Sequence, residues 1–493
     1  MTKPTVCLVT PPSVFLLDER VFPNLGILKV ASALEARGYP VEHLDLDGVS
    51  NFEQAVEAHC EVSEARYVGI TCTTPQLPAA ARIARAIRHK LGQAGPQIII
   101  GGPHPTVSLA AVKKGAGRAQ KALEQLKREF DVVVAGDGED AILQALGAPA
   151  GSVIDADDPK GPLFLTNKRL EETPWPARHL LDMGSYHYKI DGVPASTLVA
   201  QLGCPFKCTF CSGRSSPMLR RVRNRSTANV LAEIEHLYTK YGVQGLMFYD
   251  DELNVSKSMV ELMKGIAALS KRLGTEFKLR GFVKAELFTE EQADVMFSAG
   301  FRWLLCGFES GSERILTNIE KQATVEDNNR ACEYARRAGL KVKALMSAGH
   351  CGESAETIAD TERWLLDVKP DDFDLTVITP YPGSPYFDAS VETGPSVWTF
   401  THPKTGDRLH MTELDYAETV DFYKGAPGEY RAYTWTDFLA AQDLVRIRDE
   451  VEARVRAALG IPYNAGAPGI QFEASMGQTK RLPPSILRTS ATV

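Results

Sequence analysis

The stretch Gln201-Leu-Gly-Cys-Pro-Phe-Lys-Cys-Thr-Phe-Cys-Ser-Gly213 places three cysteines on one short segment. Cys204, Cys208 and Cys211 follow the spacing C-x3-C-x2-C, which supplies three thiolates and no fourth. A structural zinc site closes its tetrahedron with four protein ligands, and a cluster that only carries electrons uses four cysteines. Three thiolates therefore favour a [4Fe–4S] cluster that keeps one iron open for a small molecule. A zinc knuckle and three buried thiols are the alternatives.

This segment resembles the cluster loop of the radical S-adenosylmethionine (SAM) superfamily, and Phe210 before the last cysteine fits the same pattern. The resemblance implies that the open iron takes the amino and carboxylate groups of SAM. The cysteines follow a strand expected over 197–201, at the strand end where barrel enzymes place their chemistry.

Bulk composition narrows the class of protein. A chain of 493 residues exceeds one hydrophobic core, so we expect two or three domains. The net charge of −7 argues against general nucleic-acid binding and against an anionic membrane surface. No apolar stretch is long enough to span a bilayer, and the first residues lack a signal peptide's apolar region. The other six cysteines form no disulfide-like framework, so we expect a cytoplasmic protein.

The first 150 residues alternate apolar strands with amphipathic helices. Strands are expected within 6–9, 41–46, 67–71, 97–104 and 131–139. This rhythm predicts an α/β fold with a doubly wound parallel sheet of the flavodoxin-like type. Ligands bind such sheets at the carboxyl ends of the strands. A flavodoxin-like domain that binds nothing, or a nucleotide, is an alternative, although no G-x-G-x-x-G follows the first strand.

This segment resembles the cobalamin-binding domain that precedes the radical SAM domain in one large branch of the superfamily. The resemblance implies that cobalamin contacts residues of the loops at that edge: Leu25, Gly26, Thr73, Thr74, Gln76, Gly101, Gly102, Pro103, His104, Gly136, Asp137, Gly138 and Glu139. Other cobalamin proteins carry Asp-x-His-x-x-Gly, whose histidine ligates cobalt. Here Asp45 and Asp47 have no such histidine after them. We therefore expect base-off cobalamin without a protein histidine on cobalt, and interpret His104 as a loop residue near the corrin.

Residues 151–195 are rich in Asp, Pro and Gly, which predicts a connector. Residues 196–390 repeat six strand–helix units, which matches a partial (β/α)6 barrel. The resemblance implies that SAM contacts the following side chains: Phe210, Asp250, Asp251, Glu252, Arg280, Glu309 and Ser310. An arginine suits the carboxylate of SAM, and a glutamate suits its ribose diol. Cys351 is interpreted as a passive small residue, with a place in the active site as the alternative.

Residues 391–493 match no motif and are expected to form a mixed or helical segment that caps the substrate site, with a helix over 435–459. Their aromatic residues could instead form a small core. No catalytic residue can be assigned from the sequence.

The resemblance implies a cobalamin-dependent radical SAM methyltransferase. Such an enzyme places a methyl group from methylcobalamin on an unactivated carbon, by way of a 5′-deoxyadenosyl radical. The expected partners are a small-molecule or peptide substrate of a biosynthetic pathway and an electron donor such as flavodoxin or ferredoxin. The alternatives are a cyclase, ring-contraction enzyme or epimerase without net methylation, and a cobalamin-binding regulator. A tRNA-modifying enzyme would carry an added RNA-binding domain and more basic charge.

Overall fold

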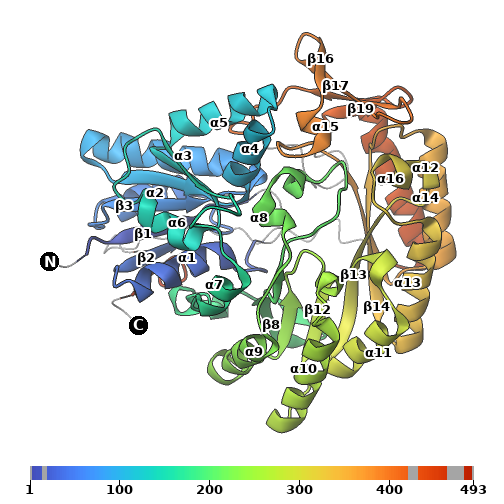
Figure 1. Cartoon of the computed structure of the whole chain (residues 1–493), viewed down its shortest axis with the longest axis horizontal. Coiled ribbons are helices and arrows are strands. Elements are labelled where there is room, and N and C mark those ends of the chain that lie inside the picture. Colours follow the sequence, from blue (N-terminus) through green and yellow to red (C-terminus); the bar gives the residue numbers. More distant parts are fainter. Residues whose placement is uncertain (1–2, 14–18, 420–430, 463–481, 491–493) are drawn as a thin grey trace.

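The computed structural model describes residues 3–13, 19–419, 431–462 and 482–490. Two seven-stranded sheets lie side by side, each with helices packed on it (Figure 1). A four-stranded sheet from the later part of the chain lies beside both. The predicted fold class is confirmed: a doubly wound N-terminal sheet is followed by a partial barrel and a mixed C-terminal segment.

The first sheet has the order β20-β2-β1-β3-β4-β5-β6 and is parallel apart from β20. Its strands are β1 (Val6–Thr10), β2 (Val41–Asp45), β3 (Tyr67–Thr71), β4 (Gln97–Gly101), β5 (Val132–Gly136), β6 (Ser152–Ala156) and β20 (Leu487–Thr489). Its helices are α1 (Leu25–Ala36), α2 (Phe52–Cys60), α3 (Leu77–Leu91), α4 (Pro103–Lys113), α5 (Gly117–Glu129) and α6 (Gly138–Ala145). Alternate residues of β1 enter separate apolar clusters on the two faces, which explains why the strand is apolar throughout.

Two strands of this sheet lie outside the N-terminal domain boundary predicted at residue 150. β6 falls within the predicted connector, yet it pairs in parallel with β5. β20 comes from the far end of the chain and pairs antiparallel with β2. The first sheet is therefore completed on both edges by segments that the sequence pattern assigned elsewhere.

The second sheet has the order β15-β14-β13-β12-β11-β8-β7. Its strands are β7 (Lys189–Ile190), β8 (Val193–Leu198), β11 (Gly245–Phe248), β12 (Lys278–Phe282), β13 (Phe301–Glu309), β14 (Lys341–Ala348) and β15 (Asp372–Val377). The helices between them are α9 (Thr227–Tyr241), α10 (Met259–Leu273), α11 (Glu290–Ala299), α12 (Glu313–Asn318), α13 (Val325–Ala338) and α14 (Ala355–Val368). Six strands, β8 and β11 to β15, run parallel, as the six predicted strand–helix units require.

Local signals in the sequence set several helix ends of this sheet. Ser226 caps α9 by accepting a hydrogen bond from the backbone N–H of Asn229. α13 stops before Gly339, whose φ of +83° suits glycine. These caps fix where each helix leaves the sheet.

Between β8 and β11 the chain forms β9 (Gln201–Leu202), η5 (Ser212–Ser215), α8 (Pro217–Arg220) and β10 (Arg223–Asn224). Before β7 it forms the short helix α7 (Asn167–Glu172).

The C-terminal segment forms α15 (Pro385–Asp388), β16 (Val391–Gly394), β17 (Val397–Thr401), β18 (Arg408–Thr412), β19 (Thr434–Thr436) and α16 (Ala441–Leu459). The predicted start of the last helix at residue 435 is wrong. Trp435 lies in β19 opposite His410 of β18, so the backbone there is extended and the helix begins at Ala441. Some of the aromatic residues considered for a small core fall within 420–430, which lies outside the described residues. No helix in the described part of the chain has the length and apolarity that a membrane crossing needs.

Candidate active site

The loop that carries the three cysteines, which we call the cluster loop (203–213), starts directly after β9. Gly203 enters it with φ +88°, and a Cβ there would lie 2.1 Å from the backbone oxygen of Arg221. Only glycine fits such a position. The backbone N–H of Cys204 donates to the carbonyl of Leu219 at 3.0 Å, and that of Thr209 donates to Ile319 at 2.9 Å. The loop is therefore held from both sides by backbone contacts.

Two of the three acids that follow β11 hold the strand that leads into the cluster loop. Asp250 is buried and accepts hydrogen bonds from the backbone N–H groups of Ala200 and Gln201, at 3.1 and 2.6 Å. Asp251 accepts one from Gly203 at 2.7 Å. These two carboxylates, predicted to contact SAM, are engaged with the protein's own backbone.

The three predicted cluster ligands are accessible yet surrounded by protein. Cys204 and Cys208 are half-buried and Cys211 is exposed. Enclosure by surrounding protein raises the pKa of Cys204 to about 11 and that of Cys211 to about 12. It also raises the pKa of Cys208, against the opposing charges of Lys321 and Lys284.

The spread of the three sulfurs argues against a single metal ion. Ligand atoms around one tetrahedral zinc ion lie roughly 3.3–3.8 Å apart, given Zn–N and Zn–S bonds of about 2.0 and 2.3 Å. Among the described residues, the one group of three candidate ligand atoms that all lie within 4.8 Å of one another is in the first sheet. The three cysteines of the cluster loop do not form such a group, so their arrangement gives no support to a zinc knuckle.

A buried polar network lies at the end of β13. Glu309, at a φ of +67°, accepts from Lys321 Nζ at 3.2 Å and from Ser347 Oγ at 2.7 Å. Burial alone would raise the pKa of Glu309, but Lys321 and Ser347 outweigh it and the pKa is lowered. Ser347 Oγ also lies 2.7 Å from His350 Nε2, and burial lowers the pKa of His350 to about 4. At neutral pH the network thus holds a carboxylate, an ammonium and a neutral imidazole.

Glu252 and Arg280 keep hydrogen-bonding capacity unused. Glu252 Oε2 is buried and has no hydrogen-bond partner among the described residues. Burial raises its pKa to about 7, against the opposing charges of Lys321 and Lys284. Arg280 donates from Nη1 to the hydroxyl of Tyr188 at 3.4 Å, while its buried Nε has no partner in the described part of the chain. An unmet buried carboxylate suits a cationic ligand such as the amino group of SAM.

Ser310 and Phe210 contact the protein itself. Ser310 Oγ lies 3.0 Å from the hydroxyl of Thr361 on α14 and accepts from the backbone N–H of Ser312 at 3.1 Å. The ring of Phe210 lies 5.3 Å from that of His350. Ser310 thus stabilises the turn after β13, and Phe210 joins the cluster loop to the network around Glu309.

The carboxyl edge of the first sheet carries the residues predicted to bind cobalamin. Gln76 Oε1 accepts from the backbone N–H of Thr73 at 3.1 Å, and Gln76 Nε2 donates to the carbonyl of Pro11 at 2.9 Å. Thr74 Oγ1 lies 3.0 Å from His104 Nδ1. Burial lowers the pKa of His104 to about 4, and its Nε2 has no partner among the described residues. These side chains brace the β1, β3 and β4 ends against one another.

Close backbone approach explains two of the glycines at this edge. A Cβ on Gly102 would lie 2.8 Å from the backbone nitrogen of Cys72, and one on Gly136 would lie 2.3 Å from the backbone of Ala156. The other predicted cobalamin contacts lie beside them: Leu25 and Gly26 at the start of α1, Gly101 and Pro103 where β4 meets α4, and Gly138 and Glu139 at the start of α6.

Asp137 joins this edge to the second domain. Its Oδ2 lies 2.7 Å from Arg223 Nη1 and accepts from the backbone N–H of Leu165 at 2.9 Å. Both charged side chains are almost fully buried. Burial raises the pKa of Asp137 in spite of the guanidinium. Asp137 is therefore engaged in an interdomain ion pair.

The cluster loop and the carboxyl edge of the first sheet meet. η5, at the end of the cluster loop, packs on α4. A Cβ on Gly383 would lie 2.3 Å from the carbonyl oxygen of Ser212 and 3.1 Å from the side chain of Val107 on α4. Two edges that each suit a cofactor therefore adjoin (Figure 1).

Two family models match the chain in this arrangement. The B12 binding domain matches residues 18–146, and the radical SAM superfamily matches residues 198–365. This chain is a cobalamin-binding radical SAM enzyme.

Relatives of this radical SAM enzyme include methyltransferases and cyclases. It is 28% identical over 337 residues to an uncharacterised methyltransferase of Pyrococcus horikoshii, covering 66% of this chain and 69% of the relative. It is 26% identical over 441 residues to the anaerobic magnesium-protoporphyrin IX monomethyl ester cyclase of Rubrivivax gelatinosus, covering 84% and 74%. The radical SAM methyltransferase TsrM of Kitasatospora setae, solved with cobalamin and a [4Fe–4S] cluster, superposes with a TM-score of 0.63 at 17% identity, covering 97% of this chain and 92% of TsrM.

Three polar residues of this enzyme's site were not among those predicted from the sequence. Lys321, Lys284 and His350 are all buried beside Glu309 or Glu252. Lys321 follows Glu309 and Ser310 closely in the sequence, and this nearness was a usable signal, because a buried lysine needs a charged or polar partner. Nothing in the local pattern marks Lys284.

Proposed function

We propose that this enzyme transfers a methyl group to an unactivated carbon of a small molecule or peptide. The observation that carries the proposal is the contact of η5 in the cluster loop with α4 of the B12-binding domain. A cobalamin at the carboxyl edge of the first sheet would face a cluster held by the loop. That proximity is what a reaction using both cofactors needs.

The cysteines of the cluster loop are the proposed ligands of a [4Fe–4S] cluster. With SAM bound, such a cluster supplies the 5′-deoxyadenosyl radical that opens an unactivated C–H bond. Glu252 offers its unmet carboxylate to the amino group of SAM, and Glu309 offers acceptors to the ribose hydroxyls. Lys321 keeps Glu309 ionised and His350 keeps Ser347 oriented.

Cobalamin is proposed to bind base-off, with no protein histidine on cobalt. Asp45, one of the two aspartates considered for the ligand motif, lies at the end of β2, forms an ion pair with Arg20 at 2.7 Å and accepts from the hydroxyl of Tyr186 at 2.9 Å. His43 lies 3.0 Å from Thr10 Oγ1 and 3.0 Å from the carbonyl of Leu180. The groups at this position are committed to one another. His104 Nε2 and Ser108 Oγ are buried and unpartnered within the described ranges. They are proposed to form hydrogen bonds with the corrin and not to bind cobalt.

The C-terminal segment is proposed to limit substrate access. Arg118 of α5 lies 3.1 Å from Glu413 and over the ring of Trp398, which fixes this segment on the first domain. Cys351 is buried, and its thiol donates to the carbonyl of Asp407 at 2.9 Å, which supports a passive role. We further propose that flavodoxin or ferredoxin supplies electrons and that no nucleic acid takes part.

The test is anaerobic reconstitution with iron, sulfide and hydroxocobalamin, followed by reduction with SAM. We expect both 5′-deoxyadenosine and S-adenosylhomocysteine, and neither from the matched variant Cys204→Ala/Cys208→Ala/Cys211→Ala loaded with cobalamin. The cyclase relative favours a second candidate, a radical reaction without methylation. That reaction gives 5′-deoxyadenosine alone.

A further inference from the structure

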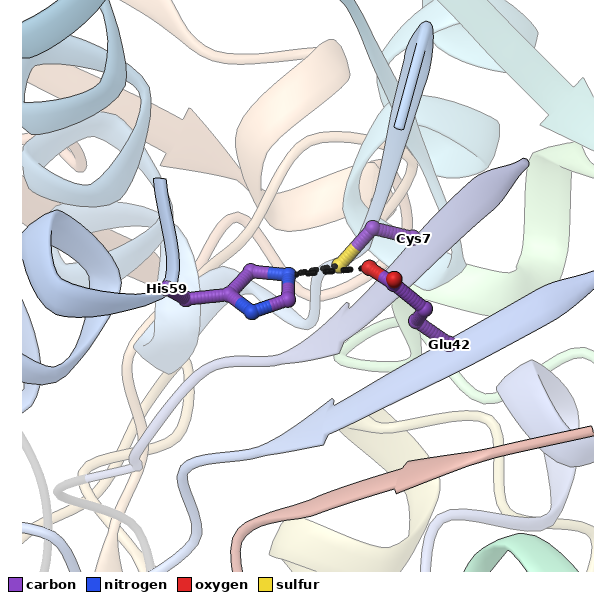
Figure 2. Close-up of side chains that lie close together, drawn as sticks. All are labelled: Cys7, Glu42 and His59. Carbon is purple, nitrogen blue, oxygen red and sulfur yellow. Dashed lines mark hydrogen bonds and ion pairs between the residues drawn. The ribbon is translucent and has the colours of Figure 1, made fainter. Parts of the chain in front are cut away.

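A second group of metal-ligand side chains lies in the first sheet, away from the cluster loop. Cys7 of β1 and Glu42 of β2 are direct neighbours in the strand pairing, and His59 of α2 packs against them (Figure 2). His59 Nε2 lies 3.4 Å from Cys7 Sγ and 3.1 Å from Glu42 Oε2. The ligand atoms of all three residues lie within 4.8 Å of one another. Cys7 and His59 are buried and Glu42 is largely so.

Hydrogen bonding accounts for only part of this convergence. A ring nitrogen of histidine carries at most one hydrogen, so Nε2 can donate fully to the thiol or to the carboxylate but not to both. Glu42 Oε2 already accepts from the hydroxyl of Ser63 at 2.7 Å. The other nitrogen, His59 Nδ1, is buried and has no partner among the described residues. Three groups that carry lone pairs thus converge, while one buried ring nitrogen is left without a partner in the described part of the chain.

The distances match those between ligands on one zinc ion. Bonds of about 2.0 Å to nitrogen and oxygen and 2.3 Å to sulfur place tetrahedral ligands roughly 3.3–3.5 Å apart. The observed separations of 3.1 and 3.4 Å lie close to these values. A thiolate, an imidazole and a carboxylate are also ligands that zinc accepts together.

The surroundings leave room for a fourth ligand. A cavity of about 30 Å³ is lined by two of the three side chains, Cys7 and His59, together with Ser63 and apolar residues. A water molecule needs only about 10–15 Å³ of such space. The cavity can therefore hold a water that completes the tetrahedron or accepts from His59 Nδ1.

We propose that Cys7, Glu42 and His59 bind one Zn²⁺ with water as the fourth ligand. Binding releases the proton of the Cys7 thiol and ties β1, β2 and α2 together. Cys7 and Glu42 lie in the amino-terminal halves of their strands, away from the carboxyl edge where the cofactors are proposed to bind. The zinc ion is thus held apart from the proposed cofactor edge and takes no part in the proposed reaction.

The test uses the full chain with Cys204→Ala, Cys208→Ala and Cys211→Ala, because the cluster thiols would also take zinc. After removal of metals by a chelator, Zn²⁺ is titrated in competition with a chromophoric chelator. We expect one equivalent to bind, with affinity at least tenfold weaker after Cys7→Ser, Glu42→Gln or His59→Gln. Cys332→Ser, which changes a buried thiol on α13, is the matched control and should keep the site.

Thermal unfolding distinguishes a variant that no longer binds zinc from a variant that no longer folds. Zn²⁺ should raise the unfolding midpoint of the parent chain, whereas Cys7→Ser should unfold as the metal-free parent does and not respond to zinc. Elemental analysis of the cluster-loaded enzyme should give one zinc per chain. Two results would overturn the proposal. In one, Cys7→Ser and His59→Gln bind zinc as tightly as the parent chain does. In the other, the parent chain binds no more zinc than a control protein without metal-ligand side chains.

Discussion

The ammonium of Lys321 lies 3.2 Å from the carboxylate of Glu309, and both side chains are enclosed where β13 leaves the second sheet. The pair lies beside the cluster loop, because Lys321 also faces the thiol of Cys208 electrostatically. A buried ion pair keeps Glu309 charged where an isolated carboxyl would take up a proton. The pair therefore presents an anionic acceptor to any ligand that enters between the cluster loop and β13.

Glu309→Gln should weaken SAM binding at least tenfold, or about 1.4 kcal/mol, because the amide accepts ribose hydroxyls less well and leaves Lys321 unpaired. Equilibrium dialysis with labelled SAM on the cluster-loaded enzyme measures this. Ser310→Ala is the matched control. Its hydroxyl is engaged by Thr361, so SAM affinity should stay within about twofold. Equal losses in the two variants would contradict the assignment.

Asp250→Ala should lower cluster occupancy and the thermal midpoint together. The change leaves the backbone N–H groups of Ala200 and Gln201 without acceptors, at about 1–3 kcal/mol each. Iron and sulfide content and the midpoint are measured after identical reconstitution. Asp250→Asn keeps one acceptor and should fall between the wild type and Asp250→Ala. Full cluster occupancy in Asp250→Ala would show that these bonds do not position the cluster loop.

Arg223→Met should destabilise the contact between the two domains by about 3–5 kcal/mol, because it leaves the buried carboxylate of Asp137 unpaired. Adding Asp137→Asn should recover part of that loss, since the neutral amide still accepts from the N–H of Leu165. Thermal unfolding of the two single variants and the double variant measures the coupling. Strictly additive midpoints would mean that the pair does not hold the domains together.

The sequence patterns predicted both sheets because apolar strands recur with amphipathic helices between them. They could not predict β20, which pairs with β2 across more than four hundred residues and carries no pattern of its own. The expected helix start at Trp435 failed because cross-strand pairing with β18 outweighs local helix propensity.

The sequence likewise predicts some residues of the candidate site and not others. The spacing of the cysteines predicts the cluster ligands, because the number of thiolates on the segment can be counted directly in the sequence. The acids after β11 look equivalent in sequence, yet Asp250 and Asp251 bind backbone N–H groups while Glu252 keeps an unmet oxygen. Only the fold decides which side chain meets the backbone. Lys284 is buried beside the site by tertiary packing that no local motif records.

The pH dependence of stability should reveal Glu353. This side chain is 1% exposed, and burial raises its pKa from the ordinary 4.5 to about 7. The folded state therefore holds the proton longer than the unfolded state does. The stabilisation is full below pH 4.5 and is lost as pH rises through 7, by roughly 3 kcal/mol. Glu353→Gln, which keeps the acceptor for Thr357, should gain thermal midpoint over the wild type between pH 5 and pH 8. A constant difference over that range would contradict this.

The two cofactor edges are proposed to meet so that a methyl group can pass from cobalamin to the substrate. The most direct measurement supplies CD₃-labelled SAM to the anaerobically reconstituted, reduced enzyme with an extract of small molecules, and follows all products by mass spectrometry. We expect 5′-deoxyadenosine together with S-adenosylhomocysteine, and one extract component that gains the labelled methyl group. Formation of 5′-deoxyadenosine and a changed component that carries no label, without S-adenosylhomocysteine, would contradict it.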